Sequence, residues 1–146
     1  IPLVRKRGYH MHYQGGRSLD LPLVDSANGY AMAPMTKGIR ITTGAELTSP
    51  DAPATPIQLG YAEAAARQLI EIGSRVEPEP WFGTRPCTTD MLPVLGPAPR
   101  HRGLWVNFGH GHQGFTLGPA TARVLAETMN GEASSVDTSP YRIDRF

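Results

Sequence analysis

The sequence contains one cysteine, Cys87, so the chain cannot form an internal disulfide, and this scarcity fits a reducing compartment such as the cytoplasm. Charge of neither sign is in excess, because 14 basic residues face 13 acidic ones and the net charge is +1. Such a balance gives no electrostatic basis for binding nucleic acid or an anionic membrane surface. No apolar run approaches the ~20 residues of a membrane-spanning helix, so membrane association is not expected from this portion. We expect a small molecule as the partner.

Glycine and proline are frequent, with 16 and 14 residues, and they lower the expected helix content in favour of short strands joined by turns. An apolar content of 40% still supports a packed core. The length of 146 residues is that of one domain. Together these features predict an α+β fold, with an antiparallel or mixed sheet and packed helices.

The first half of the chain reads as strands. A strand is expected from Gly8 to Tyr13, and alternation places three apolar side chains on one face and two histidines on the other. The inner set is Tyr9, Met11 and Tyr13, and the outer set is His10 and His12. Three short strands follow at residues 19–24, 29–34 and 38–43, with a hairpin turn at residues 36–38. The basic run at residues 5–7 is expected at a solvated edge.

A helix is expected at residues 56–72, after a proline-rich loop at residues 49–56. Thr55 suits the N-cap, Pro56 the first helical position and Gln58 a capping box, while Gly73 suits the end of the helix. One apolar stripe at helical spacing is predicted to pack on the sheet. It consists of Ile57, Tyr61, Ala65, Leu69 and Ile72.

The stretch from Gly103 to Asn130 is typical of a strand, a tight loop and a helix that hold an anionic group. A buried strand is expected at residues 104–108 and a helix at residues 119–129, with Gly131 as its stop. The loop contains Gly109, Gly111 and Gly114, which match the G-x-G-x-x-G pattern of dinucleotide sites. We do not interpret it as that fingerprint, because no second strand with an acidic residue follows about 20 positions on. Proline at position 119, placed at the start of the helix, also predicts a longer loop.

Two motifs in order carry a family resemblance. The first reads Trp81-Phe-Gly-Thr-Arg-Pro-Cys-Thr-Thr-Asp90 and continues with Pro93-Val-Leu-Gly96. The second reads Gly109-His-Gly-His-Gln-Gly-Phe-Thr116, followed by Gly118-Pro-Ala-Thr-Ala122. Together they resemble the C-terminal portion of the FAD-dependent D-amino-acid oxidase and dehydrogenase family, which includes glycine oxidase and sarcosine oxidase. The resemblance covers essentially the whole chain.

The resemblance implies that residues 1–100 are part of a substrate-binding domain and that residues 101–146 complete an FAD-binding domain. It also implies an N-terminal FAD-binding part of the same protein as a partner, and no strand with a nucleotide fingerprint stands before Gly103 to supply it. The expected cofactor is FAD and the expected substrate an amino acid, whose CH–NH bond is oxidised. The implied cofactor-binding residues are Gly109, His110, Gly111, His112, Gln113, Gly114, Phe115 and Thr116.

The resemblance also implies substrate contacts. Arg85 is the expected anchor of the substrate carboxylate, since a guanidinium matches a carboxylate with two parallel hydrogen bonds. Tyr30 and His112 are further candidates, and Tyr30 is equally suited to filling the face of a half-buried strand. No acid-base residue is assigned, because a substrate whose amine is already neutral needs none.

Two other classes of protein remain open from the sequence. The first is a non-enzymatic binding or structural module derived from that fold. The second is a metal protein that uses histidine ligands. His10, His12, His110 and His112 are the available ligands, but their spacing does not suit a metal site. The leading interpretation is therefore part of an FAD-dependent amino-acid oxidoreductase.

Overall fold

The computed structural model describes residues 1–49 and 51–146. Pro50, within the proline-rich loop expected at residues 49–56, lies outside the described residues. The chain divides into two compact units. The first unit comprises Ile1–Lys6 and Arg85–Phe146, and the second unit comprises Arg7–Thr84. The predicted α+β class is confirmed, whereas the functional division at residue 100 stays a prediction.

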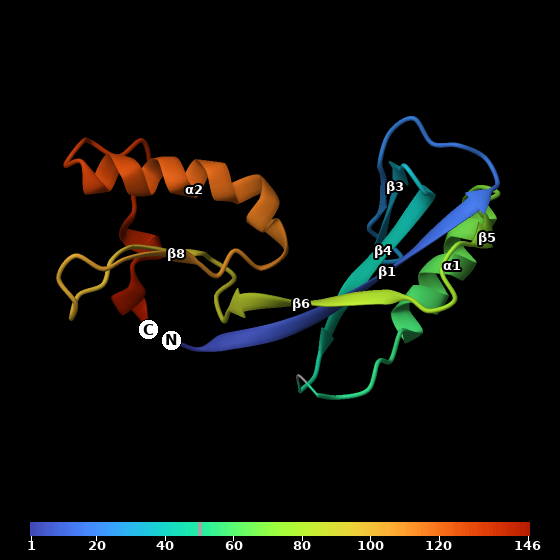
Figure 1. Ribbon diagram of the computed structural model, residues 1–146, viewed down its shortest axis with the longest axis horizontal. Coiled ribbons are helices and arrows are strands. Elements are labelled where there is room, and N and C mark those ends of the chain that lie inside the picture. Colours follow the sequence, from blue (N-terminus) through green and yellow to red (C-terminus); the bar gives the residue numbers. More distant parts are fainter. Residues whose placement is uncertain (50) are drawn as a thin grey trace. The chain divides into compact units, whose positions relative to one another are not determined.

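One sheet contains the strands of the first two thirds of the chain, in the order β2-β3-β4-β1-β5, and β6 also pairs with β1 (Figure 1). Its strands are β1 (Leu3–Gly15), β2 (Leu23–Asp25), β3 (Tyr30–Met35), β4 (Gly38–Leu47), β5 (Gly73–Arg75) and β6 (Trp81–Thr88). The pairs β2-β3, β3-β4 and β1-β5 are antiparallel. The strand expected at residues 8–13 is therefore longer than predicted, and the one expected at 19–24 is shorter.

The predicted hairpin turn is confirmed by the register of β3 and β4, in which Met35 pairs with Gly38. Gly38 has a φ of +109°, and a Cβ atom there would lie 2.1 Å from the carbonyl oxygen of Tyr13. Both the left-handed backbone and this close approach require glycine.

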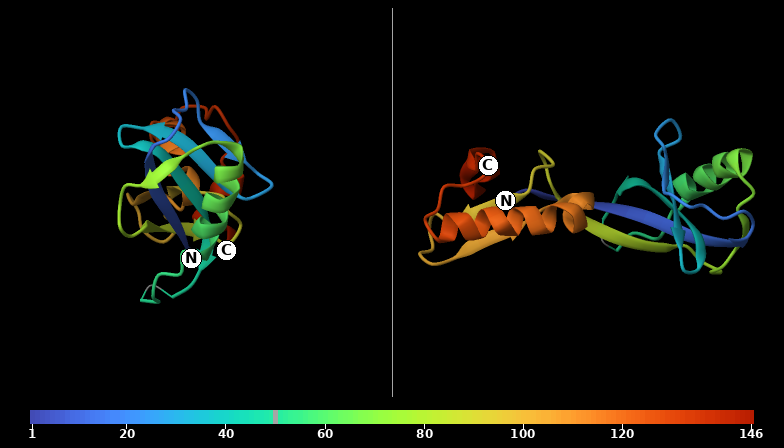
Figure 2. Two further views of the ribbon diagram at one scale, coloured as in Figure 1. Left: turned by 90° about the vertical axis from the view of Figure 1, so that its right-hand side faces the viewer. Right: turned by 90° about the horizontal axis from the view of Figure 1, so that it is seen from above.

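The core of the second unit lies on one face of the sheet, beneath helix α1 (Ile57–Leu69), which stands beside the strands in Figure 2. The predicted alternation of β1 is confirmed, because Tyr9, Met11 and Tyr13 are all buried. They pack with further buried side chains from β3, β4, α1 and the segment after α1. These are Tyr30, Met32, Ile39, Ile41, Leu59, Ala62, Ala66 and Ile72.

The predicted apolar stripe of α1 is confirmed at Ala65 and Ile72, which pack in or against the core, but it is wrong at its other positions. Leu59, Ala62 and Ala66 face the core, whereas Ile57 and Tyr61 are 63% and 73% exposed. Small side chains allow the helix backbone to approach the sheet closely, and the bulkier stripe is left on the outside. The most apolar stripe of a helix is usually its buried face. Close packing on a sheet can instead bury a stripe of smaller side chains.

The predicted capping box of α1 is also wrong. Pro56 occupies the N-cap position, and no side chain caps the helix. The Thr55 hydroxyl instead donates to Glu46, and the Thr55 backbone N–H donates to the Tyr9 hydroxyl at 2.9 Å. The last helical residue is Leu69 rather than residue 72.

Arg7 is buried, which corrects the expectation that the basic run at residues 5–7 is a solvated edge. Its side chain is 2% exposed and lies 3.5 Å from the carboxylate of Glu46. Its guanidinium donates to the carbonyl oxygens of Pro53 and Ala52, each at 2.9 Å. It also lies over the ring of Phe82, 4.8 Å from the centroid. Arg7 thus fastens the loop between β4 and α1 to the edge of the core.

The first unit is built on an antiparallel hairpin of β7 (Val94–Pro97) and β8 (Trp105–Phe108), in which Val94 pairs with Phe108. Helix α2 (Gly114–Met129) lies along this hairpin in Figure 1. Short 3-10 turns precede and follow α2, namely η1 (Gly111–Gln113), η2 (Ser139–Tyr141) and η3 (Ile143–Arg145). The predicted strand at residues 104–108 is confirmed, although it is half-buried rather than buried.

Helix α2 starts earlier than predicted, at Gly114, and Pro119 lies inside it rather than at its first position. Proline there lacks the N–H that would bond the carbonyl of Phe115, and the ribbon of α2 bends in its first turns (Figure 1). The preceding loop is accordingly short, which corrects the longer loop that was expected. The predicted stop is confirmed, because Gly131 has a φ of +70° and the N–H of Glu132 donates to Glu127.

Candidate functional site

The glycine loop, residues 109–113, lies against the end of β6. Gly109 and Gly111 have φ angles of +78° and +56°. A Cβ atom on Gly109 would lie 3.0 Å from the methyl of Thr88, and one on Gly111 would lie 3.2 Å from the Cys87 sulfur. Cys87 also forms an isolated backbone bridge with His110. Both glycines are therefore required by backbone conformation and by close packing on β6.

The two loop histidines have different surroundings. His110 Nε2 lies 2.9 Å from the hydroxyl of Thr121. That hydroxyl donates to a carbonyl of the preceding turn of α2, at 3.0 Å for Leu117 and 3.1 Å for Gly118, so Nε2–H of His110 is the donor to Thr121. His110 thus fastens the loop to α2. His112 is exposed, which leaves its imidazole available to a ligand.

The N-terminus of α2 has no side-chain cap. Gln113 occupies the N-cap position and forms no side-chain cap hydrogen bond. The first backbone N–H groups of a helix have no partner within the helix, and the helix dipole favours negative charge there. Phe115, in the first turn, is fully exposed, and Thr116 is exposed as well. The loop and helix start together form a surface suited to an anionic, partly apolar group.

A cavity of about 460 Å³ opens beside this loop, within the first unit. Its walls are mainly apolar and come from the turn before β7, from α2 and from the C-terminal segment. They consist of Met91, Leu92, Pro93, Leu95, His110, His112, Gln113, Leu117, Ala120, Thr121, Val124, Val136 and Tyr141. A volume of this size is in the range of small-molecule sites.

The predicted substrate contacts fall in both units. Arg85 is half-buried in the first unit, on β6, and its guanidinium forms no hydrogen bond or salt bridge within residues 1–49 and 51–146. Tyr30 is only 3% exposed and belongs to the core of the second unit. Burial raises the pKa of the Tyr30 hydroxyl. The packing of Tyr30 matches the alternative role that the sequence left open, an aromatic filling the core face of a strand.

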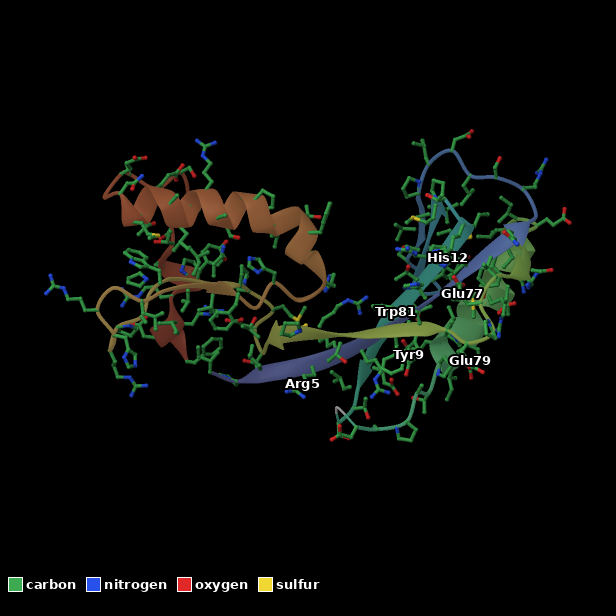
Figure 3. The ribbon with its side chains drawn as sticks, viewed as in Figure 1. Arg5, Tyr9, His12, Glu77, Glu79 and Trp81 are labelled. Carbon is green, nitrogen blue, oxygen red and sulfur yellow. The ribbon has the colours of Figure 1, made fainter. Side chains whose placement is uncertain are left out.

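The outer face of β1 carries a polar cluster in the second unit. His12 is buried, and its Nδ1 donates to Glu77 at 2.9 Å while its Nε2 accepts from Arg40 at 3.0 Å; His12 and Glu77 lie beside each other in Figure 3. His10 stacks on the ring of Trp81 with centroids 4.7 Å apart. Partial burial and the nearby Arg40 charge lower the pKa of His10.

The hypothesis of a histidine metal site finds no support in the structure. Both ring nitrogens of His12 are already hydrogen-bonded, and His110 is bonded to α2. Among the described residues, no group of three or more His, Cys, Asp or Glu side chains is arranged to hold a metal.

Sequence reasoning missed three residues of the first unit. Met91 has a φ of +64° and lines the cavity, and the Asp90–Arg145 ion pair joins the turn before β7 to the C-terminal segment. No local pattern indicates a left-handed methionine or a pair 55 positions apart. The burial of Arg7, in contrast, had a signal, since Arg7 has the same alternation as Tyr9 and Met11.

Comparison with known proteins places the chain in a family. Residues 1–128 match the family model described as DAO, FAD dependent oxidoreductase, and the chain belongs to this family. It is 30% identical to a D-amino acid dehydrogenase of Paramagnetospirillum magneticum over 150 residues, covering 100% of this chain and 35% of that protein. It is 32% identical to a glycine oxidase of Pseudomonas aeruginosa over 144 residues, covering 97% and 39%.

The fold agrees with this membership. The crystal structure of glycine oxidase from Geobacillus kaustophilus matches with a TM-score of 0.73 at 22% identity, over 99% of this chain and 39% of that one. The chain thus spans between a third and two fifths of the length of these relatives. No helix in the described ranges combines the length and apolarity needed to cross a membrane.

Proposed function

We propose that this chain is the flavin-facing and substrate-facing part of an FAD-dependent amino-acid oxidoreductase. The reaction oxidises the CH–NH bond of an amino acid to an imino acid, which water converts to a 2-oxo acid and ammonia. The observation that carries the proposal is the glycine loop with its uncapped helix start, in a chain whose residues 1–128 match the FAD dependent oxidoreductase family.

The glycine loop suits a flavin for reasons present in the structure. Gly109 and Gly111 give the loop left-handed turns that lie close against β6, and no side chain caps the first N–H groups of α2. FAD, when bound, supplies the acceptor for the two electrons of the substrate. The residues proposed to hold it are 109–116, whose amides and helix dipole favour negative charge at the pyrimidine edge. His110 contributes indirectly in this proposal, because its imidazole is bonded to α2.

Arg85 is the proposed partner of the substrate carboxylate. It is half-buried and has no protein partner among the described residues, so its two-point fork is available for a carboxylate. His112, which is exposed within the loop, is a secondary candidate for a polar contact with flavin or substrate. Tyr30 supports the core of the sheet in this proposal, because its side chain is 3% exposed.

The test uses the full-length flavoprotein that contains this chain. The purified protein is expected to show the visible absorption of bound oxidised flavin, and anaerobic addition of the correct amino acid should bleach it. A panel of D-amino acids, L-amino acids, glycine and N-methylglycine identifies the substrate class. A full-length protein that carries no flavin and binds the same amino acids without turnover would instead be a binding module.

Residues 1–146 by themselves are expected to retain little or no FAD. In the proposed function the glycine loop would contact only the flavin ring, whereas tight FAD binding also needs a strand, loop and helix for the pyrophosphate, which this sequence does not supply. The measurement is the flavin absorbance that co-purifies with the chain, relative to its protein absorbance. Stoichiometric flavin on residues 1–146 would contradict this expectation and would restore the dinucleotide reading of Gly109, Gly111 and Gly114.

Gly111 and Gly114 form a matched pair for testing the loop. Gly111→Ala introduces a side chain at a φ of +56° and 3.2 Å from the Cys87 sulfur, which costs about 1 to 2 kcal/mol for the left-handed backbone alone. Gly114 has a helical φ of −58°, and a Cβ there meets only His110 Cβ, at 3.5 Å.

Gly111→Ala is therefore expected to distort the loop and lower flavin affinity in the full-length protein. Gly114→Ala should keep the fold, whereas Gly114→Val should keep the fold and lower flavin affinity by obstructing backbone approach. Thermal unfolding and flavin titration separate the two effects. Unchanged flavin affinity in both Gly111→Ala and Gly114→Val would show that the loop faces solvent.

A further inference from the structure

Arg145 ties the C-terminal segment to the turn before β7. Its Nε donates to one oxygen of Asp90 at 2.7 Å, and its Nη2 donates to the other at 3.2 Å. The same Nη2 donates to the carbonyl oxygen of Leu92 at 2.8 Å. The Arg145 side chain is 13% exposed and that of Asp90 is 34% exposed, so the pair lies at the surface with the arginine side largely covered. Such a bidentate pair fixes geometry as well as supplying attraction.

The turn that Arg145 holds is closed by its own hydrogen bonds. Asp90 accepts from the backbone N–H of Leu92 at 3.0 Å, and the Thr88 hydroxyl donates to the Leu92 carbonyl at 2.6 Å. The Arg145 guanidinium is the main reason that the pKa of Asp90 lies well below its usual range, and the Leu92 N–H adds to the effect. Asp90 is therefore charged and paired with Arg145 at neutral pH.

Met91, at the tip of this turn, has the left-handed φ of +64° that methionine rarely adopts. Such a conformation persists when surrounding contacts hold it in place. The turn also lies next to the glycine loop. A Cβ atom built on Gly111 would lie 3.7 Å from the Met91 methyl, and one on Gly109 would lie 3.0 Å from the Thr88 methyl.

We infer that Arg145 is a positioning residue for the glycine loop: through Asp90 and Leu92 it holds the turn at residues 88–92, whose Met91 and Thr88 support Gly111 and Gly109. This inference rests on the proposed function, in which that loop faces the flavin. All the residues that link Arg145 to the glycine loop belong to the first unit. Arg145 itself touches neither the loop nor the cavity lining beyond Leu92.

The test compares Arg145→Met with Arg142→Met in the full-length protein. Arg142 pairs with the exposed Asp144 and makes no side-chain hydrogen bond to the turn, so its loss controls for removal of a C-terminal charge. Hydrogen exchange is measured on peptides that cover residues 88–92 and 108–114. Arg145→Met should speed exchange in both segments, and Arg142→Met in neither. Unchanged exchange at 108–114 in Arg145→Met would overturn the inference, whether or not the protein carries flavin.

Flavin readouts separate positioning from plain stabilisation. Arg145→Met is expected to shift the visible flavin bands and lower kcat by about ten- to a hundred-fold, as small misplacements of a supporting group do, with KM changed less. Arg145→Lys should recover only part, since an ammonium cannot bond Asp90 at two points and Leu92 together. A lowered melting temperature with an unaltered flavin spectrum and kcat would contradict the positioning role. Turnover by the unaltered protein, scored separately, tests the proposed function.

Discussion

Arg85→Met in the full-length flavoprotein is expected to lower kcat/KM for its amino-acid substrate by about 30-fold or more. Losing one partner of a desolvated charge pair costs about 2 to 5 kcal/mol, which corresponds to that lower bound and to several thousand-fold at the upper end. The visible absorption spectrum of the flavin should not change. Arg85 makes no hydrogen bond to another described residue, so its removal leaves no protein group without a partner. Steady-state kinetics and the visible spectrum measure the two effects.

Two comparisons make the Arg85 test specific. Arg85→Lys should recover only part of the loss, because an ammonium cannot reproduce the two-point fork. Arg123→Met is the matched control, since Arg123 is exposed on α2 and forms only a surface pair with Glu127, which contributes little to stability. The substrate and its carboxamide analogue are both assayed. Equal penalties from Arg85→Met on the two compounds would end the assignment of Arg85 as the carboxylate anchor.

Arg7→Met is expected to lower the free energy of unfolding of the second unit by about 3 kcal/mol, since hydrogen bonds to a charged group contribute roughly 1.5 to 3 kcal/mol each. The variant leaves the carbonyl oxygens of Ala52 and Pro53 without their donors and removes the positive partner of Glu46. The loop between β4 and α1 should then open to proteolysis before the rest of the chain. Denaturant unfolding and limited proteolysis measure the two consequences.

Arg5→Met controls for Arg7, because Arg5 precedes Arg7 by two positions on β1 but is exposed. Arg7→Lys keeps a positive charge while losing most of the four guanidinium contacts to the loop and Tyr9, so it should fall between Arg7→Met and the unaltered protein. A loss of stability in Arg5→Met equal to that in Arg7→Met would indicate a general effect of charge on this strand instead of a buried anchor.

Alternation along β1 shows how far local sequence patterns reach. It correctly placed Tyr9, Met11 and Tyr13 on the core face, and the same rule extended two residues earlier predicts that Arg7 faces inward. The basic composition of residues 5–7 was given more weight than the alternation, and Arg7 was expected in solvent. Burial of an arginine depends on partners for its donors, and those come from the loop 45 positions away.

Helical patterns were less decisive, for two physical reasons. In α1 the large apolar side chains Ile57 and Tyr61 lie outside, since close packing of the helix on the sheet favours Ala62 and Ala66. In α2 the proline rule placed the helix start at Pro119, whereas the helix tolerates this proline at the expense of a bend and begins at Gly114. In both helices the prediction relied on the type of single residues, whereas the outcome depends on the residues that pack against them in the folded chain.

The sequence by itself determined the α+β class, the β3-β4 hairpin, the position of the glycine loop and membership of the flavin oxidoreductase family. These depend on short-range preferences, such as strand alternation and glycine at left-handed turns, or on motifs contiguous in the chain. Only the tertiary structure decided that Arg7 is buried, that Met91 is left-handed and that Arg145 pairs with Asp90. These features require groups brought together from distant positions, where the surrounding packing outweighs the local preference of each residue.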